Sequence, residues 1–213
     1  SSLNVVKLSG MAKGLTRERI VDAALAVLDE GGIDAVTLRT VAARLDVRAP
    51  ALYWHVPNKQ HLLDEMGTEI QRRVQAVLAE VPADTAWTEA LRTYAGILRT
   101  EYLAHRDGAR TFSGTRLTDP DVLRAQEPWL GRWTGAGLTL RDAMDAAELV
   151  TSYVVGFTIE EQERVQSEAS DPERYSVAAR DAAVGPDAPL VAEAGHARGA
   201  ADARFARQLD ILL

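Results

Sequence analysis

The sequence has 213 residues, carries a net charge of −7 and contains no cysteine. The lack of cysteine excludes a disulfide framework, a thiolate metal site and a thiol nucleophile, and it favours a reducing, cytoplasmic environment. No apolar run approaches the roughly 20 residues that span a bilayer, so we expect a soluble protein with a small unit and a larger one.

Charge is distributed unevenly along the chain. Residues 1–60 hold 8 lysines and arginines against 6 acidic residues, a net charge of +2, which leaves −9 for the rest of the chain. A mildly basic first quarter on an acidic body fits a small module that contacts a polyanion and a larger part that does not.

The first part of the chain shows the hydrophobic period of four successive helices. Apolar positions three and four residues apart follow Thr16 as far as a Gly-Gly pair, and Thr37 can cap a second, shorter helix. Pro50 suits the first turn of a third helix of barely two turns. Asn58 can cap a fourth helix that continues towards residue 82, a rod of roughly 30 Å that is long enough to join two units.

Helical periodicity continues through the second part of the chain. We expect a fifth helix over residues 87–105, a short helix and loop over 106–118, a helix over 119–135 and a long helix over 139–164. Residues 165–186 lack sustained periodicity and are predicted as a mobile loop with at most a turn of helix. Two helical pieces follow, at about 188–197 and 200–213. No strand pattern is found, so the predicted fold class is all-α.

Residues 37–56 have the pattern of a helix-turn-helix unit, with two short helices around a tight turn. In such units the second helix enters the DNA major groove and its first side chains read base edges. Arg48 stands at the entry to that helix, where a guanidinium can bind guanine O6 and N7, while Tyr53 and His55 can donate hydrogen bonds to phosphates. Aromatic residues at helical spacing are more often core residues, so we expect Trp54 to be structural, and the pattern alone leaves Tyr53 and His55 open.

The same residues carry a resemblance to a known family. Residues 15–64, "LTRERIVDAALAVLDEGGIDAVTLRTVAARLDVRAPALYWHVPNKQHLLD", resemble the DNA-binding domain of the tetracycline-repressor (TetR) family, and "LYWHVPNK" is close to its most distinctive run. "AHRDGAR", "GTR" and "GFTIEEQE" resemble segments of the ligand-binding domain of its tetracycline-responsive members. The resemblance implies a ligand-responsive repressor with an N-terminal three-helix helix-turn-helix domain, and a larger C-terminal helical domain for ligand binding and dimerisation.

Carried over by motif position, the resemblance implies a set of DNA contacts from the second and third helices and their flanks. These are Leu38, Arg39, Arg48, Ala49, Pro50, Ala51, Tyr53, His55 and Lys59. Tetracycline-responsive members have an acidic residue and an amide where this chain has Arg48 and Ala49, so we expect a different operator sequence.

The resemblance also implies an effector pocket in the larger domain. Its lining would include Gln75, Tyr94, Leu98, Phe112, Thr115, Arg116, Leu117, Ser152 and Glu160. Three histidine positions of tetracycline-responsive members are Phe112, Ser152 and Gln75 here, and phenylalanine cannot ligate a metal. We therefore expect no metal and no cofactor, and an effector that is bulky and largely apolar or aromatic. Glu160 can equally be a solvated helix end, and Arg116 can equally cap a loop carbonyl.

These inferences predict three parts of the chain and a homodimer. Residues 1–14 would form a flexible arm, 15–60 the DNA-binding domain, and 61–213 the effector-binding and dimerisation domain. Two copies would pair through the long helix and the C-terminal helix, and present recognition helices roughly 34 Å apart to a palindromic operator. The expected interface side chains are Val150, Val154, Phe157, Leu209 and Leu212.

Two other classes of function stay open on the sequence. A helical enzyme is disfavoured, because the four histidines are scattered and no phosphate-binding glycine loop, zinc-protease helix motif or nucleophile elbow is found. A helical ligand-binding or protein-interaction module that never touches DNA is the stronger alternative. Salt-dependent retention on duplex DNA separates it from a repressor.

Overall fold

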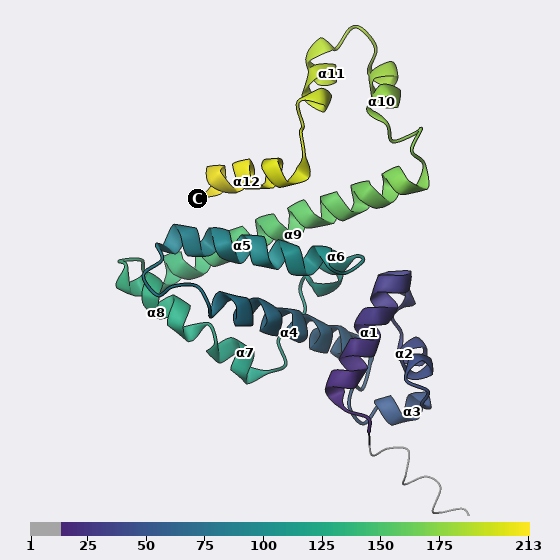
Figure 1. Ribbon diagram of the computed structural model, residues 1–213, viewed down its shortest axis with the longest axis vertical. Coiled ribbons are helices and arrows are strands. Elements are labelled where there is room, and N and C mark those ends of the chain that lie inside the picture. Colours follow the sequence, from purple (N-terminus) through teal and green to yellow (C-terminus); the bar gives the residue numbers. More distant parts are fainter. Residues whose placement is uncertain (1–13) are drawn as a thin grey trace, which may run out of the picture.

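The structure is a computed structural model that describes residues 14–213, which are helical with loops and contain no strand. The predicted all-α class is therefore confirmed, while residues 1–13 of the predicted arm lie outside the described residues. A small three-helix unit lies at one end of the molecule, beside a larger helical body from which a hairpin of two short helices extends (Figure 1).

The small unit consists of α1 (Arg17–Gly31), a 3-10 turn (Ile33–Ala35), α2 (Leu38–Arg44) and α3 (Ala49–Leu52). The predicted caps are present, since the Thr16 hydroxyl accepts a hydrogen bond from the Arg19 N–H at 3.3 Å. The Thr37 and Thr40 side chains each accept from the other residue's N–H and so close a capping box. These caps satisfy N–H groups that a helix start leaves without partners.

Helix α4 (Lys59–Leu78) connects the small unit to the body, and the Asn58 side chain caps it as predicted. Its N-terminal half packs on α1, where Arg17 reaches the buried Glu65 carboxylate at 3.1 Å. Its apolar stripe of Leu62, Met66, Ile70 and Val74 is fully buried. The same rigid rod therefore carries part of the core of both units.

The body is built from α5 (Trp87–Leu103), α6 (Gly108–Phe112), α7 (Pro120–Arg124), α8 (Glu127–Gly135) and α9 (Leu140–Ser170). Helices α5 and α9 pack on each other along their length and also contact α6. Residues 119–135, predicted as one helix, form two, because Pro128 lacks the N–H that would continue the first. Helix α9 begins at the predicted Thr139 cap and continues about a turn and a half beyond residue 164.

The chain ends in α10 (Val177–Val184), α11 (Pro189–His196) and α12 (Ala201–Leu212), with α12 lying along α9 (Figure 1). The predicted loop over residues 165–186 is wrong. Its first six residues belong to α9, and the Ser176 side chain caps α10 through the Ala179 N–H at 3.0 Å. A cap of this kind stabilises a short helix that has no buried residue and hence no hydrophobic period to detect.

Three residues of the expected dimer interface face the interior of the chain. Val150 and Val154 are 1% and 0% exposed, and Leu209 is also buried. The apolar side chains that α9 and α12 leave exposed include Leu149 and Ile211, which are 59% and 86% exposed. Within residues 14–213, no helix is long and apolar enough to cross a membrane.

Candidate nucleic-acid interface and ligand pocket

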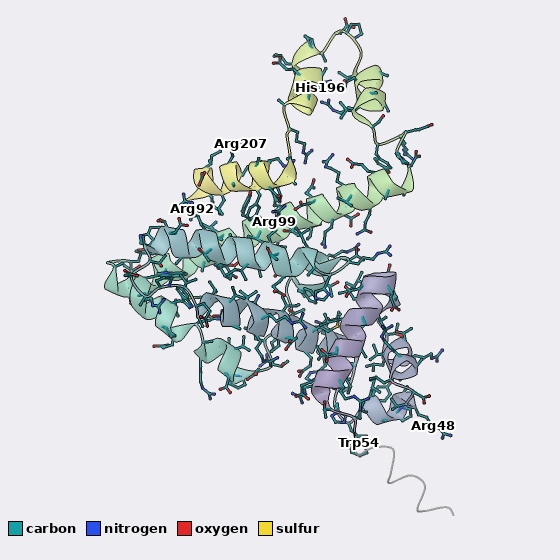
Figure 2. The ribbon with its side chains drawn as sticks, viewed as in Figure 1. Arg48, Trp54, Arg92, Arg99, His196 and Arg207 are labelled. Carbon is teal, nitrogen blue, oxygen red and sulfur yellow. The ribbon has the colours of Figure 1, made fainter. Side chains whose placement is uncertain are left out.

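Helix α3 is held to the small unit by its inward side chains and presents the others to solvent. Leu52 and Val56, four residues apart, are fully buried, whereas Arg48, Pro50 and Tyr53 are exposed. The expectation that Trp54 is a core residue is wrong, because its side chain is 91% exposed. Arg48 and Trp54 lie at the end of the molecule opposite the α10–α11 hairpin (Figure 2).

The arginines of this surface differ in whether a carboxylate already binds them. Arg44 donates to both carboxylate oxygens of Glu30, at 2.8 and 2.9 Å. Arg39 and Arg48 are exposed and form no ion pair with any residue in the described range. Their guanidinium groups are therefore free to donate hydrogen bonds to an external acceptor, such as a phosphate or a guanine edge.

Among the remaining predicted DNA contacts, some side chains are half-buried and Lys59 is exposed. Ala49 and Ala51 are half-buried on α3, Leu38 packs partly against the core of the small unit, and His55 is half-buried at the end of the turn that follows α3. The Lys59 ammonium donates to the Ile33 carbonyl at 3.2 Å and joins the start of α4 to the 3-10 turn. Since an ammonium has three N–H donors, this bond leaves Lys59 able to contact a phosphate.

A pocket of about 340 Å³ lies in the body between α4, α5, α8 and α9. Its walls are mainly apolar and aromatic, and polar groups come from glutamines, a tyrosine, a threonine and one glutamate. The lining residues are Gln71, Gln75, Leu78, Ala90, Tyr94, Gln126, Trp129, Leu130, Trp133, Met144, Ala147, Glu148 and Thr151. Such a volume and lining suit a small organic ligand.

Polar atoms of the pocket are arranged to meet a ligand. The Tyr94 hydroxyl and the Thr151 hydroxyl are 2.9 Å apart and share a hydrogen bond, and burial raises the pKa of the Tyr94 phenol above its ordinary value. The Gln75 Oε1 acceptor and the Trp133 Nε1 donor are buried and have no hydrogen-bond partner among the described residues. A ligand that offers both a donor and an acceptor would satisfy them.

The structure brings Gln75 and Tyr94 together in this pocket and places the other predicted lining residues elsewhere. Leu98 is fully buried between helices, and Phe112 packs against Tyr102 and edge-on against His105. Ser152 and Glu160 line a separate hollow on the face of α9 that is turned to α12.

Three more of the predicted lining residues, Thr115, Arg116 and Leu117, lie in the loop after α6, which runs along α4. The Arg116 N–H donates to Asp64 at 3.1 Å, and a Cβ on Gly67 would lie only 2.1 Å from the Thr115 hydroxyl. The loop and α4 therefore approach each other as closely as a glycine permits.

Several pocket residues, including Trp129, Trp133, Met144 and Glu148, were missed by sequence reasoning. Trp129 and Trp133 are four residues apart on α8 and both are buried. That spacing is a usable signal for one shared helix face, but it does not distinguish a core face from a pocket wall.

A second set of contacts joins the body to the C-terminal end of α1. His105 Nδ1 lies 2.9 Å from Asp29 Oδ1. Asp107 accepts a hydrogen bond from the Ile33 N–H at 3.1 Å through one oxygen, and from the Gln166 amide of α9 at 2.8 Å through the other. Asp107 is thus a bridge between the small unit and the long helix of the body.

Gly32 makes room for this bridge. Its φ is 73°, in the left-handed region, and a Cβ at this position would meet Asp107 Oδ2 at 2.5 Å. Glycine is therefore required both by the backbone conformation and by the close approach of the carboxylate.

Within residues 14–213, no group of three or more histidine, aspartate or glutamate side chains is placed to hold a metal ion.

Comparison with known proteins identifies relatives over both units. Residues 20–66 match the family described as bacterial regulatory proteins, tetR family, and residues 81–213 match the tetracyclin repressor-like C-terminal domain. The class D tetracycline repressor protein of Escherichia coli is 37% identical over 158 residues, which cover 74% of this chain and 72% of that protein.

Solved structures of regulators of this kind have a similar fold. A TetR variant from Acinetobacter baumannii AYE in complex with minocycline gives a TM-score of 0.70 at 31% identity, covering 93% of this chain and 94% of the other. BioQ, solved with its double-stranded DNA operator, gives a TM-score of 0.59 at 34% identity, covering 76% of this chain and 91% of the other.

Proposed function

Because the chain belongs to the tetR family of bacterial regulatory proteins, we propose that it represses transcription as a homodimer on a palindromic operator, from which a small-molecule effector releases it. Residues 15–60 form the DNA-binding domain in this proposal, and residues 61–213 form the effector-binding and dimerisation domain. The observation that carries the proposal is the exposed face of α3, where Arg48 has no ion-pair partner among the described residues.

In the proposed complex α3 enters the major groove. The buried Leu52 and Val56 fix the orientation of the helix, so that Arg48 and Arg39 reach base edges. Tyr53, His55 and Lys59 bind the phosphates that flank the groove, and the half-buried Ala49 and Ala51, with Leu38 and Pro50, complete the contact surface. The proposal is supported by the relative BioQ, which was solved with a DNA operator.

The proposed effector binds in the pocket lined by Trp129, Trp133 and Tyr94. The aromatic walls favour a flat, largely apolar molecule, and the free Gln75 Oε1 and Trp133 Nε1 favour one that carries a donor and an acceptor. The class D tetracycline repressor protein and the TetR variant solved with minocycline support a pocket in this domain. The lack of a histidine at Phe112, Ser152 and Gln75 supports an effector that carries no metal ion.

Two connections can transmit occupancy of the pocket to the DNA-binding domain. Gln71, Gln75 and Leu78 of the pocket lie on α4, the rod that also packs on α1. Asp107 connects the Ile33 N–H to Gln166 of α9, whose other half lines the pocket. A shift of α4 or α9 on effector binding would move the small unit, and the linkage is reciprocal, so operator must weaken effector binding by the same factor.

We place the proposed dimer interface on the exposed apolar side chains of α9 and α12, which include Leu149, Ile211 and Leu212. A two-fold axis through this face would repeat α3 on one side of the DNA. The proposal includes no catalytic step, no cofactor and no metal, and it places the protein in the cytoplasm.

The proposal is tested by selecting duplexes that the full chain retains from a random pool, then measuring their affinity by gel mobility shift. We expect a palindromic consensus and an affinity that falls steeply with salt concentration, because Lys and Arg displace counterions from DNA. The absence of any salt-dependent retention would instead favour a helical ligand-binding or interaction module without DNA binding. A monomeric mass in analytical ultracentrifugation would overturn the dimer.

A further inference from the structure

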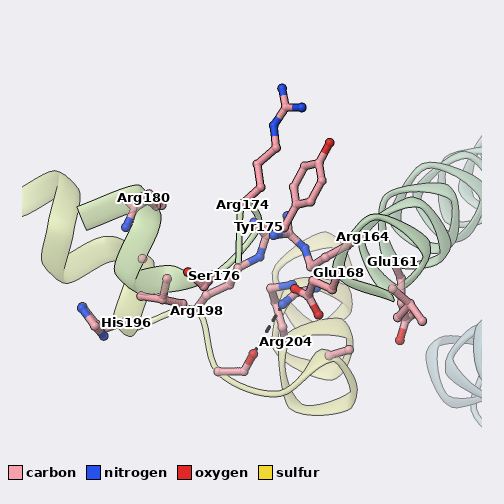
Figure 3. A pocket seen from close by; sticks show the side chains of 15 residues that line it. Glu161, Arg164, Glu168, Arg174, Tyr175, Ser176, Arg180, His196, Arg198 and Arg204 are labelled. Carbon is pink, nitrogen blue, oxygen red and sulfur yellow. Dashed lines mark hydrogen bonds between the residues drawn. The ribbon is translucent and has the colours of Figure 1, made fainter. Parts of the chain in front are cut away.

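A second cavity, distinct from the effector pocket, lies at the other end of α9. It has a volume of about 640 Å³, is open to solvent on one side, and is bounded by the C-terminal half of α9, the α10–α11 hairpin and the start of α12 (Figure 3). Five arginines line it, namely Arg164, Arg174, Arg180, Arg198 and Arg204, together with His196, Glu161 and Glu168. So dense a cationic cluster is unexpected in a chain whose net charge is −7.

Two of the nearby carboxylates are already bound elsewhere, and a third, Glu168, lines the cavity and forms no ion pair within residues 14–213. Glu161 is already bound by Arg99 of α5, with two hydrogen bonds of 2.9 and 2.7 Å. One carboxylate oxygen of Asp181 lies 2.6 Å from His196 Nε2, and the other lies 3.3 Å from Arg180 Nη1. Asp181 therefore pairs with side chains of the hairpin. Arg180 also donates to the carbonyls of Val191 and Ala192, which fixes it as a structural link within the hairpin.

Three of the arginines are left to face the cavity without a carboxylate partner. Arg164, Arg198 and Arg204 form no ion pair with any residue in the part of the chain that the structure describes. Arg204 is held in place by the ring of Phe157, 4.9 Å from its guanidinium carbon, whereas Arg174 extends away from the group in Figure 3. The three guanidinium groups come from α9, the loop before α12, and α12.

The electrostatics of Arg198 agree with this arrangement. Burial lowers the pKa of its guanidinium below the ordinary value, and the positive charges of Arg164 and Arg204 lower it further, against a smaller opposing effect of Glu160. Like charges held together in this way are destabilising, and an anion between them would relieve the repulsion.

We propose that this cavity is a binding site for a multivalent oxyanion, a phosphate-bearing or polycarboxylate small molecule, held by Arg164, Arg198 and Arg204. Guanidinium groups match the geometry of phosphate and carboxylate oxygens and bind them through two parallel hydrogen bonds. The volume is within the range of small-molecule sites, and a concave wall on three sides favours such a ligand over a flat protein surface. The site is separate from the proposed operator and effector sites, and it adjoins the proposed dimer interface, since α9 and α12 contribute to both.

The test is calorimetric titration of the full chain with sodium pyrophosphate and, separately, with sodium citrate, each against sodium chloride of equal ionic strength. We expect saturable binding of at least one of the two multivalent anions and none of chloride. Pyrophosphate and citrate distinguish the phosphate from the carboxylate form of the ligand. Removal of one guanidinium in Arg198→Gln or Arg164→Gln should weaken binding about tenfold, the effect of a lost charge-assisted hydrogen bond pair.

Arg124→Gln is the matched control, because Arg124 is an exposed arginine of α7 whose one ion-pair partner within residues 14–213 is its helix neighbour Asp121. It removes the same charge and should leave the anion affinity within about twofold of wild type, since Arg124 does not line the cavity and a distant surface charge is screened. If Arg124→Gln and Arg198→Gln weakened anion binding equally, the effect would come from net charge alone and the proposed site would be overturned.

Two further outcomes would also overturn it. Loss of anion binding in Arg48→Gln, with retention in Arg198→Gln, would place the anion on the DNA-binding surface. No saturable binding of either anion by wild type, together with dissociation to monomers in Arg198→Gln seen by analytical ultracentrifugation, would mean that acidic groups of a second copy occupy the cavity.

Discussion

Asp107 is the residue whose removal should most directly separate the DNA-binding domain from the body. Its carboxylate accepts hydrogen bonds from the Ile33 N–H and the Gln166 side chain, and its φ of 55° is in the left-handed region. Replacement by alanine removes both bonds, each about 1.5 kcal/mol at the low end for a charged acceptor, because the site is only part-buried. Alanine at this φ adds about 1 kcal/mol of backbone strain.

We therefore expect Asp107→Ala to lower the free energy of unfolding by about 3 to 4 kcal/mol in urea denaturation. Asp107→Asn is the control, because asparagine tolerates the left-handed conformation and keeps one acceptor oxygen. Its free energy of unfolding should fall by about half as much as that of Asp107→Ala. In a double-mutant cycle, Asp107→Ala and Gln166→Ala should couple by about 1 kcal/mol, since each removes the partner of the other.

The same variant tests the proposed transmission. If Asp107 carries part of it beside α4, operator should change the effector affinity of Asp107→Ala by a smaller factor than it changes that of wild type. The reasoning would be refuted by an Asp107→Ala protein whose free energy of unfolding is within about 0.5 kcal/mol of the wild-type value. It would also be refuted if operator changed the effector affinity of this variant by the full wild-type factor.

Three other outcomes follow from the geometry. Leu52→Ala leaves a cavity at a fully buried position of α3, so it should lower the free energy of unfolding in urea by about 3 to 5 kcal/mol and abolish operator binding. A decrease of less than about 1 kcal/mol would contradict the role of Leu52 in anchoring α3. Arg48→Ala should reduce the free energy of operator binding by about 1 to 3 kcal/mol and relax the preference at one base pair. Lys59→Ala should weaken binding to all operator variants alike, and gel shifts across single-base variants check both predictions. Burial raises the pKa of Tyr94 and Tyr102, so the unfolded chain ionises first and stability, intact below about pH 10, should fall as pH rises further. Thermal unfolding from pH 8 to 11 checks this, and Tyr94→Phe should reduce the fall.

Local signals in the sequence predicted the small unit well. The caps at Thr16, Thr37 and Asn58 depend on side chains that lie within three residues of the N–H groups they satisfy, so the sequence specifies them directly. The buried stripe of α1 follows from the same short-range period. Trp54 escaped this reasoning because it lies in a turn beyond α3, where helical spacing no longer determines which side faces inward.

The body was harder to predict because its sites are made by distant segments. The pocket combines residues from α4, α5, α8 and α9, and only tertiary packing decides that Trp133 lines it while Leu98 fills the core. Val150 and Val154 were assigned to a dimer interface for the same reason. An apolar stripe on α9 is equally consistent with a partner chain or with α5, and the structure places α5 against it.

The exposure of Trp54 gives the protein an intrinsic optical reporter. An indole in water emits at longer wavelength than one shielded from it, so contact of α3 with a duplex should shift the emission of Trp54, which is 91% exposed, to shorter wavelength. Trp129 and Trp133 are buried in the pocket walls and would instead be quenched or shifted by a bound aromatic molecule. Comparison of the unlabelled wild type with Trp54→Phe, which keeps Trp87, Trp129 and Trp133, assigns each change in emission to its site.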